Sequence, residues 1–421
     1  MWSSVSMYIM PASLLEDFRV MSIPLMQFLD SVIGLLLCAV LGTFERLRSF
    51  VWSGRSIDER VERVLIVKFF GMGSIAMATP TIAALREKHP SAKIDLLTFA
   101  PNAEFAEILG CFDQVWRLPT SHFSEFAGRL LTLLPNLRGV RYDVVLDLEF
   151  FSYFSHLVSY LSGARRRIGF ISPLKWRGAL STDKVFFNHY RHMTQVFLTQ
   201  AHVLGCAQDP SRLARPVLAP SLDDRIRQVL ASRGVPEQAP IIALNPNASN
   251  MCLERRWPAE YFSELVVRLR ARYPACWFVF VGAPDEKDYV AGILSRFAPE
   301  ETRQIIGLAG DLSIPEFLAF LKRCSLLITN DSGPSHMANL MELPTIIFFG
   351  PSPPSLLKPV GPKHRVLYKG VWCSPCLNYY TLAGPLCKGD NICMKQISVD
   401  ETFSAVEEHV ARLPSLMSAV R

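Results

Sequence analysis

The sequence has few charged residues and no dense block of one sign. Only 19% of its 421 residues are Asp, Glu, Lys or Arg, and the formal net charge is +6. A nucleic-acid-binding domain carries a much denser basic patch, so this mild excess favours an anionic substrate or a membrane surface. The ten cysteines are scattered apart from one late cluster, which argues against a secreted disulfide scaffold and favours a reducing compartment.

Residues 1–60 form an N-terminal apolar segment that is unlike the remainder of the chain. Its run Ile23–Phe44 is long enough to cross a bilayer as a helix, although Asp30 would be costly at the membrane centre. No basic region precedes the run, so a cleaved signal peptide is not expected. Three interpretations remain open for residues 23–44: a span or anchor, a helix lying in the interface, and a helix packed on the first domain.

Basic residues follow this apolar run. Arg46, Arg48 and Arg55 come after it, whereas a single Arg faces Glu16 and Asp17 before it. Under the positive-inside rule, the bulk of the chain is then expected on the cytoplasmic side of the membrane. If residues 23–44 do not attach to the membrane, we expect the cytosol.

Beyond residue 60, buried-strand runs alternate with helical patterns, once between 64 and 169 and again between 241 and 348. Such alternation predicts βαβ units and parallel sheets. The intervening residues 207–222 carry Pro210, Pro216 and Pro220 and are typical of a linker. We therefore predict an α/β protein with two Rossmann-like doubly wound domains facing a ligand cleft, at residues 61–210 and 223–421, joined by a linker at 211–222.

The strongest local signal is the turn Asn330-Asp331-Ser332-Gly333, which separates a strand-like run from a helix starting at Pro334. A helix that begins there presents unpaired backbone N–H groups and the positive end of its dipole, a natural seat for a phosphate. Asp331, Ser332 and His336 lie within one turn of that seat. The alternative is an ordinary strand–helix turn with a capping Asp or Ser.

A second glycine turn, Gly71-x-Gly73-x-x-Ala76, fits the dinucleotide fingerprint. That fingerprint also requires an acidic residue at the end of the second strand, and Asp95 enters the strand instead of ending it. A loop at Gly71 and Gly73 that lets an acceptor or a phosphate approach the backbone fits better. Glycines required only for strand–helix packing are the alternative.

Taken together, the two halves resemble glycosyltransferase family 9, the heptosyltransferases that build the inner core of lipopolysaccharide. The resemblance runs from about residue 62 to 405 and rests on motifs in a fixed order: residues 64–73, 79–86, 143–147 and 161–170, Arg256-Trp-Pro258, Leu308-Ala-Gly310, residues 329–336 and Phe349-Gly-Pro351. It implies a GT-B fold, with the nucleotide-sugar in the C-terminal domain and the acceptor in the N-terminal one. It also implies inverting transfer without a metal or other cofactor.

The resemblance gives roles to several residues of the second domain. The helix start at Ser332–Gly333 would hold the leaving diphosphate, with His336 donating to it. Arg255 would pair with the same diphosphate, since its guanidinium suits phosphate oxygens. Ser249 matches a small hydroxyl position, and Glu286 matches an acidic position expected at the ribose. Arg255 and Glu286 could equally be solvated charges that flank helices.

Residue 74 departs from the family pattern. The family has an Asp there, its proposed catalytic base, whereas this chain has Ser74. A serine hydroxyl does not accept a proton at neutral pH without a partner. Asp147 and Glu149, at the carboxyl end of the fourth predicted strand, are the candidates for a replacement base. The alternatives are an acceptor that needs less activation and a loss of catalysis.

Two clusters have more than one interpretation. Arg165, Arg166 and Arg167, with Lys175 and Arg177 after them, could meet phosphates of a lipopolysaccharide core or simply flank a buried strand. The four cysteines of the late cluster could hold a structural zinc, form disulfides, remain free thiols in a long loop, or hold an iron–sulfur cluster. These cysteines are Cys373, Cys376, Cys387 and Cys393.

We therefore expect an inverting glycosyltransferase that moves a sugar, heptose from ADP-heptose, onto lipopolysaccharide core or a related glycolipid. The expected place is the cytoplasmic face of the inner membrane, with no nucleic acid as partner. One alternative is the same scaffold with another nucleotide-sugar or acceptor. The other is a non-catalytic sugar-nucleotide or glycolipid-binding protein, with a nicotinamide-dependent oxidoreductase more remote.

Overall fold

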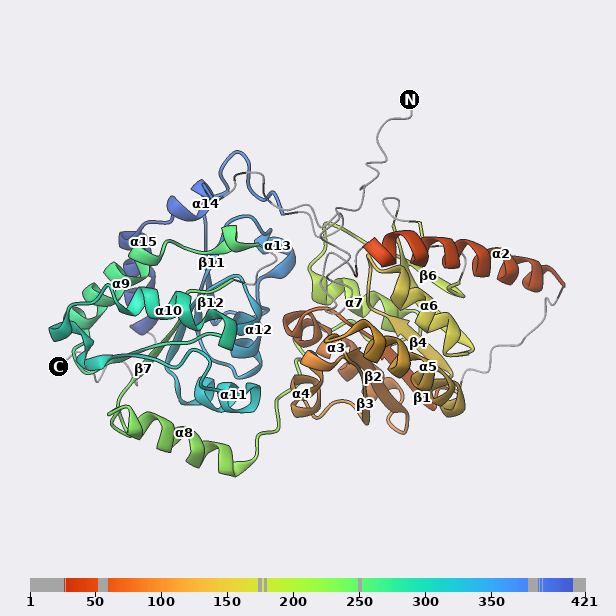
Figure 1. The fold of residues 1–421 in the computed structure, drawn as a ribbon, viewed down its shortest axis with the longest axis horizontal. Coiled ribbons are helices and arrows are strands. Elements are labelled where there is room, and N and C mark those ends of the chain that lie inside the picture. Colours follow the sequence, from red (N-terminus) through yellow and green to blue (C-terminus); the bar gives the residue numbers. More distant parts are fainter. Residues whose placement is uncertain are drawn as a thin grey trace. The chain divides into compact units, whose positions relative to one another are not determined.

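The computed structural model describes residues 26, 28–51, 60–172, 176–177, 180–248, 252–377, 385, 387 and 389–411. The chain divides into two compact units (Figure 1). Unit 1 takes the described residues up to Phe70 together with 89–103 and 112–187. Unit 2 takes residues 71–88, 104–111 and the described residues from 188 onward.

Unit 1 is built on a six-stranded parallel sheet. Its strands are β1 (Arg63–Val67), β2 (Lys93–Phe99), β3 (Gln114–Leu118), β4 (Val144–Asp147), β5 (Arg166–Ile171) and β6 (Asp183–Phe186). The order across the sheet is β3-β2-β1-β4-β5-β6. All four residues of β4 are buried, as are four of the five residues of β1, because helices cover both faces of a parallel sheet.

The helices of the first half of the chain precede, connect or follow these strands. They are η3 (Asp30–Gly34), α2 (Leu35–Val51), α3 (Met72–Lys88), α4 (Ala100–Ile108), α5 (Phe123–Val140), α6 (Tyr153–Leu161) and α7 (Met193–His202). One apolar core joins β1, β2 and β4 to α5 and α6 and includes Leu65, Leu97, Val145, Leu133 and Val158.

Unit 2 contains a second parallel sheet of six strands. The strands are β7 (Ile241–Asn245), β8 (Trp277–Phe280), β9 (Ile305–Gly307), β10 (Leu326–Asn330), β11 (Thr345–Phe349) and β12 (His364–Tyr368). The helices are α8 (Pro220–Ser232), η4 (Leu253–Arg255), α9 (Ala259–Arg272), η5 (Pro284–Glu286), α10 (Lys287–Leu294), η6 (Pro299–Gln304), α11 (Ile314–Arg323), α12 (Gly333–Leu340), α13 (Pro354–Leu357), α14 (Ile392–Lys395) and α15 (Val399–Val410).

The two sheets share one topology. The second runs β12-β11-β10-β7-β8-β9, so each sheet has its first and fourth strands side by side at the point where the order reverses. The predicted α/β class with two doubly wound sheets is therefore confirmed. In such sheets ligands bind beyond the carboxyl ends of the strands at this reversal, which lies between β1 and β4 in unit 1 and between β7 and β10 in unit 2.

The sequence analysis missed several elements, among them the edge strands β6 and β12 and the helices α7, α8 and α15. Helix α8 begins at Pro220, inside the segment predicted as a linker at 211–222. Pro at the first helical position is compatible with a helix start, so the third proline of that segment begins a helix.

The N-terminal helix packs on α6. Asp30 accepts hydrogen bonds from Ser152 Oγ at 3.1 Å and from the backbone N–H groups of Tyr153 at 3.1 Å and Phe154 at 2.7 Å. Farther along, the Glu45 carboxylate pairs with Arg167 at 3.3 Å. These contacts agree with the interpretation of residues 23–44 as a helix packed on the first domain. Asp30 thus serves as a partner for the N-terminal turn of α6.

Within the described part of the chain, no helix is both long enough and apolar enough to cross a bilayer. The interpretation of residues 23–44 as a membrane span is therefore not supported there. The physical reason is that one side of this helix is committed to α6, through Asp30 at its start and the buried Cys38 and Gly34 farther on.

We predict that Asp30→Ala lowers the free energy of unfolding by about 1–2 kcal/mol, because the first amides of α6 lose an anionic partner at the positive end of the helix dipole. Urea unfolding followed by circular dichroism measures the change. Asp30→Asn keeps an acceptor but loses the charge, so its effect should be smaller. An Asp30→Ala protein as stable as the wild type would contradict this role.

Candidate active site

At the strand-order reversal of unit 2, side-chain amides join the ends of neighbouring strands. Asn245 is the last residue of β7, and its Nδ2 donates to Thr329 Oγ1 at 2.9 Å and to Ser332 Oγ at 3.0 Å. Asn247 Nδ2 donates back to Asn245 Oδ1 at 3.0 Å. This network fixes the position of Ser332 relative to both strands. Sequence analysis missed both asparagines, although their place after a buried strand in Leu244-Asn-Pro-Asn247 was a signal.

Asn330, the last residue of β10, holds the segment that carries the Arg-Trp-Pro motif. Its Oδ1 accepts from the Trp257 backbone N–H at 2.9 Å, and its Nδ2 donates to the Pro246 carbonyl at 2.8 Å. The Trp257 ring is fully buried and stacks on Phe348 with centroids 4.4 Å apart. The motif therefore anchors Arg255, two residues earlier, beside the end of β10.

Helix α12 begins at Gly333, one residue before the start that the sequence predicted at Pro334. Ser332 has extended backbone at φ −159° and is followed by Gly333 and Pro334, so the helix begins abruptly at the end of β10. No side chain accepts a hydrogen bond from the first turn as an N-terminal cap in the described structure. Ser332 Oγ instead donates to the Asn330 carbonyl at 3.2 Å. The amide N–H groups of the first turn remain suited to an anion.

Arg255 and Asp331 lie together at this helix start. Arg255 Nη1 donates to the Asp331 carbonyl at 3.0 Å and lies 3.7 Å from its Oδ2. Burial raises the pKa of Asp331, and the Arg255 guanidinium opposes that rise. Asp331 is thus a neighbour that orients Arg255. The guanidinium is 12% exposed, so this residue is not a solvated helix-flank charge.

Glu286 lies at the same end of the sheet. A Cβ on Gly282 would come within 2.7 Å of Asn247 Nδ2 and 3.3 Å of Glu286 Cβ, which shows how tightly these groups meet. Glu286 Oε2 accepts from the Ala283 N–H at 2.8 Å, and burial raises the pKa of its carboxyl group. Gly310 has φ +76° and its N–H donates to the Gly282 carbonyl, so the Leu-Ala-Gly motif supports this loop.

His336 occupies the first turns of α12 and is buried against α3. Burial, with the nearby His192 and His364, lowers the pKa of His336 to about 3, so the imidazole is neutral at pH 7. A Cβ on Gly73 would lie 2.8 Å from His336 Cδ2, so only glycine fits there without displacement. His336 can offer one N–H but no positive charge.

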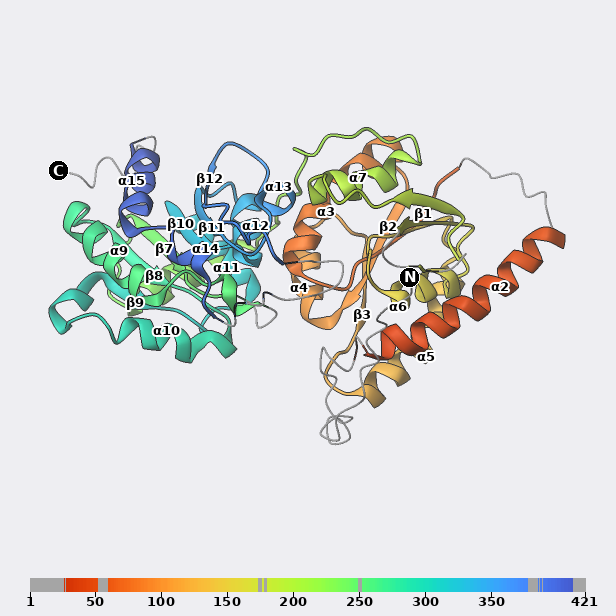
Figure 2. The same ribbon diagram turned by 90° about the horizontal axis from the view of Figure 1, so that it is seen from above.

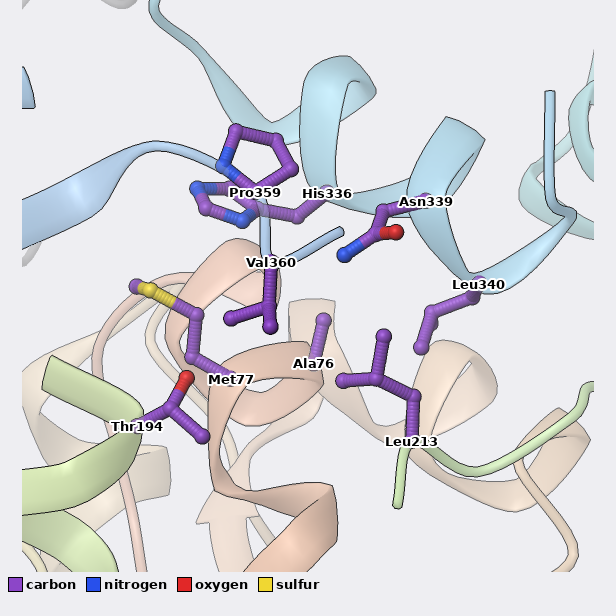
Figure 3. A pocket seen from close by; sticks show the side chains of 9 residues that line it. All are labelled: Ala76, Met77, Thr194, Leu213, His336, Asn339, Leu340, Pro359 and Val360. Carbon is purple, nitrogen blue, oxygen red and sulfur yellow. The ribbon is translucent and has the colours of Figure 1, made fainter. Parts of the chain in front are cut away.

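A small pocket lies beside His336 within unit 2 (Figure 3). Its cavity volume of about 10 Å³ has room for a single water molecule, and most of its lining is apolar. It is lined by Ala76, Met77, Thr194, Leu213, His336, Asn339, Leu340, Pro359 and Val360. A nucleotide-sugar does not fit this cavity, so it is distinct from the helix start at Ser332.

The strand-order reversal of unit 1 holds a buried ion pair. Lys68 Nζ lies 2.7 Å from Glu149 Oε1, and both side chains are at most 2% exposed. The same Glu149 oxygen accepts from the backbone N–H groups of Phe69 at 2.7 Å and Phe70 at 3.0 Å. Glu149 therefore ties the segment after β4 to the segment after β1.

Asp147 belongs to a second buried network. Its Oδ2 lies 2.5 Å from Arg177 Nη2, 3.1 Å from Ser155 Oγ and 3.2 Å from His156 Nδ1. Burial raises the pKa of Asp147, but Arg177 and His156 outweigh it and hold the pKa below its ordinary value. Nothing in the spacing of the sequence pointed to Arg177 as this partner.

These contacts argue against Asp147 or Glu149 as the replacement base. Both carboxylates are almost completely buried and already pair with cations inside unit 1. A general base needs a lone pair within reach of an incoming hydroxyl and a pKa near the working pH. Ser74 lies in the first turn of α3, partly exposed, with its N–H donating to the Gly71 carbonyl at 3.0 Å. Gly71 has φ +80°, which explains the glycine in this turn.

Most of the described arginines of the predicted basic stretch pair with or donate to other residues of unit 1. Arg166 pairs with Asp183 at 2.7 Å, Arg167 donates to the carbonyls of Leu180 and Ala164, and Arg177 is buried with Asp147. Arg165 is 66% exposed. The interpretation as residues flanking a buried strand is favoured for Arg166 and Arg167. Lys175 and Ser249 lie outside the described residues.

The late cysteines are all free thiols, as are the other six. Cys376 and Cys387 are exposed, whereas Cys393 is buried against Gly350. Among the described residues, no group of three or more His, Cys, Asp or Glu side chains is placed to hold a metal ion. No disulfide joins the four late cysteines, but their thiols are near one another, since, after burial, Cys373 and Cys387 contribute to the raised pKa of Cys376 and all three to that of Cys393. The zinc and iron–sulfur interpretations stay predictions.

Two doubly wound parallel sheets of the same topology form the GT-B architecture, which is that of a class of glycosyltransferases. The family model for glycosyltransferase family 9 (heptosyltransferase) matches residues 130–386. The chain belongs to this family, as its motifs predicted.

Two relatives with similar sequences are lipopolysaccharide heptosyltransferases. Lipopolysaccharide heptosyltransferase 2 of Escherichia coli K12 is 24% identical over 311 residues, which cover 72% of this chain and 87% of the relative. Lipopolysaccharide heptosyltransferase 3 of the same strain is 25% identical over 287 residues, 66% of this chain and 79% of the relative.

Two solved structures share the fold. The E. coli ADP-heptose lipopolysaccharide heptosyltransferase II superposes with a TM-score of 0.67 at 19% identity, covering 83% of this chain and 99% of that one. A glycosyltransferase family 9 protein of Veillonella parvula DSM 2008 gives a TM-score of 0.70 at 19% identity, with 83% and 97% covered.

We predict that Asp147→Asn lowers the free energy of unfolding by about 3–5 kcal/mol at pH 7, because Arg177 is left buried without its counter-ion. The pKa of Asp147 is lowered in the folded state, so its stabilisation is present above pH 3.8, its ordinary value, and is lost as the pH falls through the folded pKa. Urea unfolding of the wild type and of Asp147→Asn measures the difference in free energy of unfolding at pH 7 and at successively lower pH. This difference should shrink as the pH falls below 3.8.

The matched control is Asp223→Asn, which breaks an exposed pair with Lys322. It should change stability by at most about 1 kcal/mol. If Asp147→Asn were equally mild, the network would be dispensable, and Asp147 would again be a candidate base.

Proposed function

We propose that this protein transfers heptose from ADP-heptose to lipopolysaccharide core or a related glycolipid, with inversion and without a metal ion. The observation that carries the proposal is the placement of Arg255 beside the α12 start at Ser332–Gly333. Glu286 lies near Asn247, which is linked to that helix start through Asn245. The named activities of its relatives, which are lipopolysaccharide and lipooligosaccharide heptosyltransferases, support the choice of donor and acceptor.

In this proposal the donor diphosphate sits at the start of α12. Amide N–H groups of the first turn and the Arg255 guanidinium bind its oxygens, and Ser332 is held in place by Asn245. Glu286 accepts from a ribose hydroxyl, and Ser249 adds a hydroxyl to the same site. His336, being neutral, contributes at most one N–H donor.

The transfer step follows from these charges. The acceptor oxygen forms a bond to the anomeric carbon while the bond from that carbon to the diphosphate oxygen breaks. The bonding electrons go to the diphosphate, whose added negative charge is stabilised by Arg255 and the helix dipole without a metal. The hydroxyl proton leaves as well; Ser74 supplies no carboxylate to take it, so in this proposal the proton passes to solvent water. The acceptor hydroxyl is therefore one that needs less activation than in the rest of the family, and Gly71 and Gly73 let it approach the backbone.

The acceptor is a glycolipid, so the proposed place of action is the cytoplasmic face of the inner membrane. Ser74 specifically favours one alternative, in which the same scaffold serves another nucleotide-sugar or acceptor. A panel of radiolabelled nucleotide-sugars separates these cases. Release of nucleoside diphosphate identifies a transferase and its donor, whereas retention of an intact nucleotide-sugar would identify a binding protein.

We predict that Arg255→Ala weakens donor binding by about 10- to 100-fold, the loss expected for hydrogen bonds from a charged group. Calorimetric titration of the full chain with ADP-heptose measures it. Arg255→Lys keeps the charge but loses the planar fork, so its loss should be intermediate.

The control for this series is Arg225→Ala, which removes an exposed arginine paired with Glu316. It should leave donor affinity unchanged. If a folded Arg255→Ala protein bound ADP-heptose with wild-type affinity, the donor diphosphate would not bind at the start of α12.

We also predict that Ser74→Asp raises the rate constant for transfer at least about tenfold, since a positioned general base contributes 10²–10⁴-fold. The measurement is steady-state release of nucleoside diphosphate with donor and acceptor saturating. Ser74→Asn is the uncharged control and should not increase the rate. An equal rate for Ser74→Asp and the wild type would show that residue 74 does not reach the reacting hydroxyl.

A further inference from the structure

The helix formed by η3 and α2 has an outer side of exposed aliphatic and aromatic residues that the proposed reaction does not use. Five of them, on α2, are at least 46% exposed: Leu36 at 61%, Leu37 at 46%, Val40 at 66%, Phe44 at 58% and Leu47 at 65%. They recur at spacings of three or four residues, which places them on one face of the helix. Val32, Ile33 and Leu35 extend this apolar face towards η3.

The opposite side of the same helix is held by unit 1. Gly34 lies so close to α6 that a Cβ there would be 2.7 Å from Tyr153 Cβ, and Cys38 is completely buried against the same residue. Asp30 holds the beginning of the helix on α6, and Glu45 contacts Tyr160 of α6 and Arg167 of β5. The helix is therefore fixed on unit 1 from Asp30 to Glu45, while its last turn projects beyond α6 (Figures 1 and 2), and its apolar face cannot turn inward.

The contacts of the helix decide how it can meet a bilayer. The five residues of η3 and the 17 of α2 form one helix of 22 residues, roughly 33 Å at 1.5 Å each, so length alone would not prevent it from crossing a core about 30 Å thick. One side of the helix is held by α6, however, and no helix among the described residues is both long and apolar enough to cross a membrane. Lying in the plane of the interface, the helix can bury the apolar face while α6 stays outside the hydrocarbon.

Charge indicates which bilayer this face would meet. Arg46 is exposed and projects from the flank of the apolar face of α2, where a long basic side chain can reach phosphate while its stem covers apolar surface. The net charge of +6 also favours an anionic surface. A glycolipid acceptor, which rests on the proposed function, would be presented in such a surface.

We infer that the apolar face of α2 docks unit 1 on an anionic phospholipid bilayer, with the helix lying in the membrane interface. The attachment is peripheral, and it uses the face opposite to α6. It requires neither donor nor acceptor, so it is measured independently of the transferase reaction.

The test is flotation of the full chain with vesicles of phosphatidylcholine alone or mixed with phosphatidylglycerol, without donor or acceptor. The wild type should float with the mixed vesicles. Replacing Leu36, Val40 and Leu47 together by Gln should weaken binding at least about tenfold, because each replacement removes buried methyl groups. Arg46→Gln should weaken binding to the mixed vesicles about fivefold and leave phosphatidylcholine vesicles unaffected.

A matched pair of single variants separates docking from general hydrophobicity. Leu47→Gln and Leu131→Gln change residues of the same type that are 65% and 73% exposed, the second on α5. Only Leu47→Gln should weaken vesicle binding, and thermal unfolding should show all variants folded. Failure of the wild type to float, or equal binding by the triple variant, would overturn the inference.

One further outcome would also overturn it. If sedimentation without vesicles showed a wild-type dimer that the triple variant does not form, and vesicle binding were absent, the face would join two copies of the chain. A protein that docks on vesicles but releases no nucleoside diphosphate would leave the docking intact and count against the proposed function alone.

Discussion

The candidate site depends on the hydrogen bonds of two asparagines that end neighbouring strands. Where the strand order reverses, the loops after β7 and β10 part in opposite directions, and their buried polar groups need partners from side chains. Asn245 joins Thr329 to Ser332, and Asn330 joins Trp257 to the segment after β7. The start of α12 and the position of Arg255 both follow from these bonds, so the fold itself sets the geometry of the candidate site.

The first sheet has the same topology but different chemistry at the equivalent point. There Lys68 pairs with Glu149 across the ends of β1 and β4, and Arg177 pairs with Asp147 at the end of β4. Buried charges are tolerated because each is paired and further hydrogen-bonded, and removing one partner is costly for the same reason. Carboxylates at the carboxyl end of a strand are therefore not catalytic by position alone. What matters is whether a cation of the fold already holds them.

The sequence predicted the parts of this molecule that depend on local pattern. Alternating strand and helix runs indicated both sheets, and Ser332-Gly333-Pro334 indicated an abrupt helix start. It did not predict β6 or β12, which are only partly buried and follow no predicted helix, so neither alternation nor a continuous apolar run indicated them. Nor did it predict that Arg177 pairs with Asp147 across 30 positions. Such pairs are set by the tertiary fold, and no spacing rule identifies them.

Asp30 shows how one long-range contact changes the interpretation of a whole segment. In the sequence it interrupts an apolar run and would be costly in a membrane. In the structure its carboxylate binds the first amides of α6, so the polar residue attaches the helix to the protein. Once that side is committed, the remaining apolar residues can no longer surround a spanning helix and are left on a single exposed face. The residue that disfavours a membrane span is thus also the one that orients α2 for a role at a membrane surface.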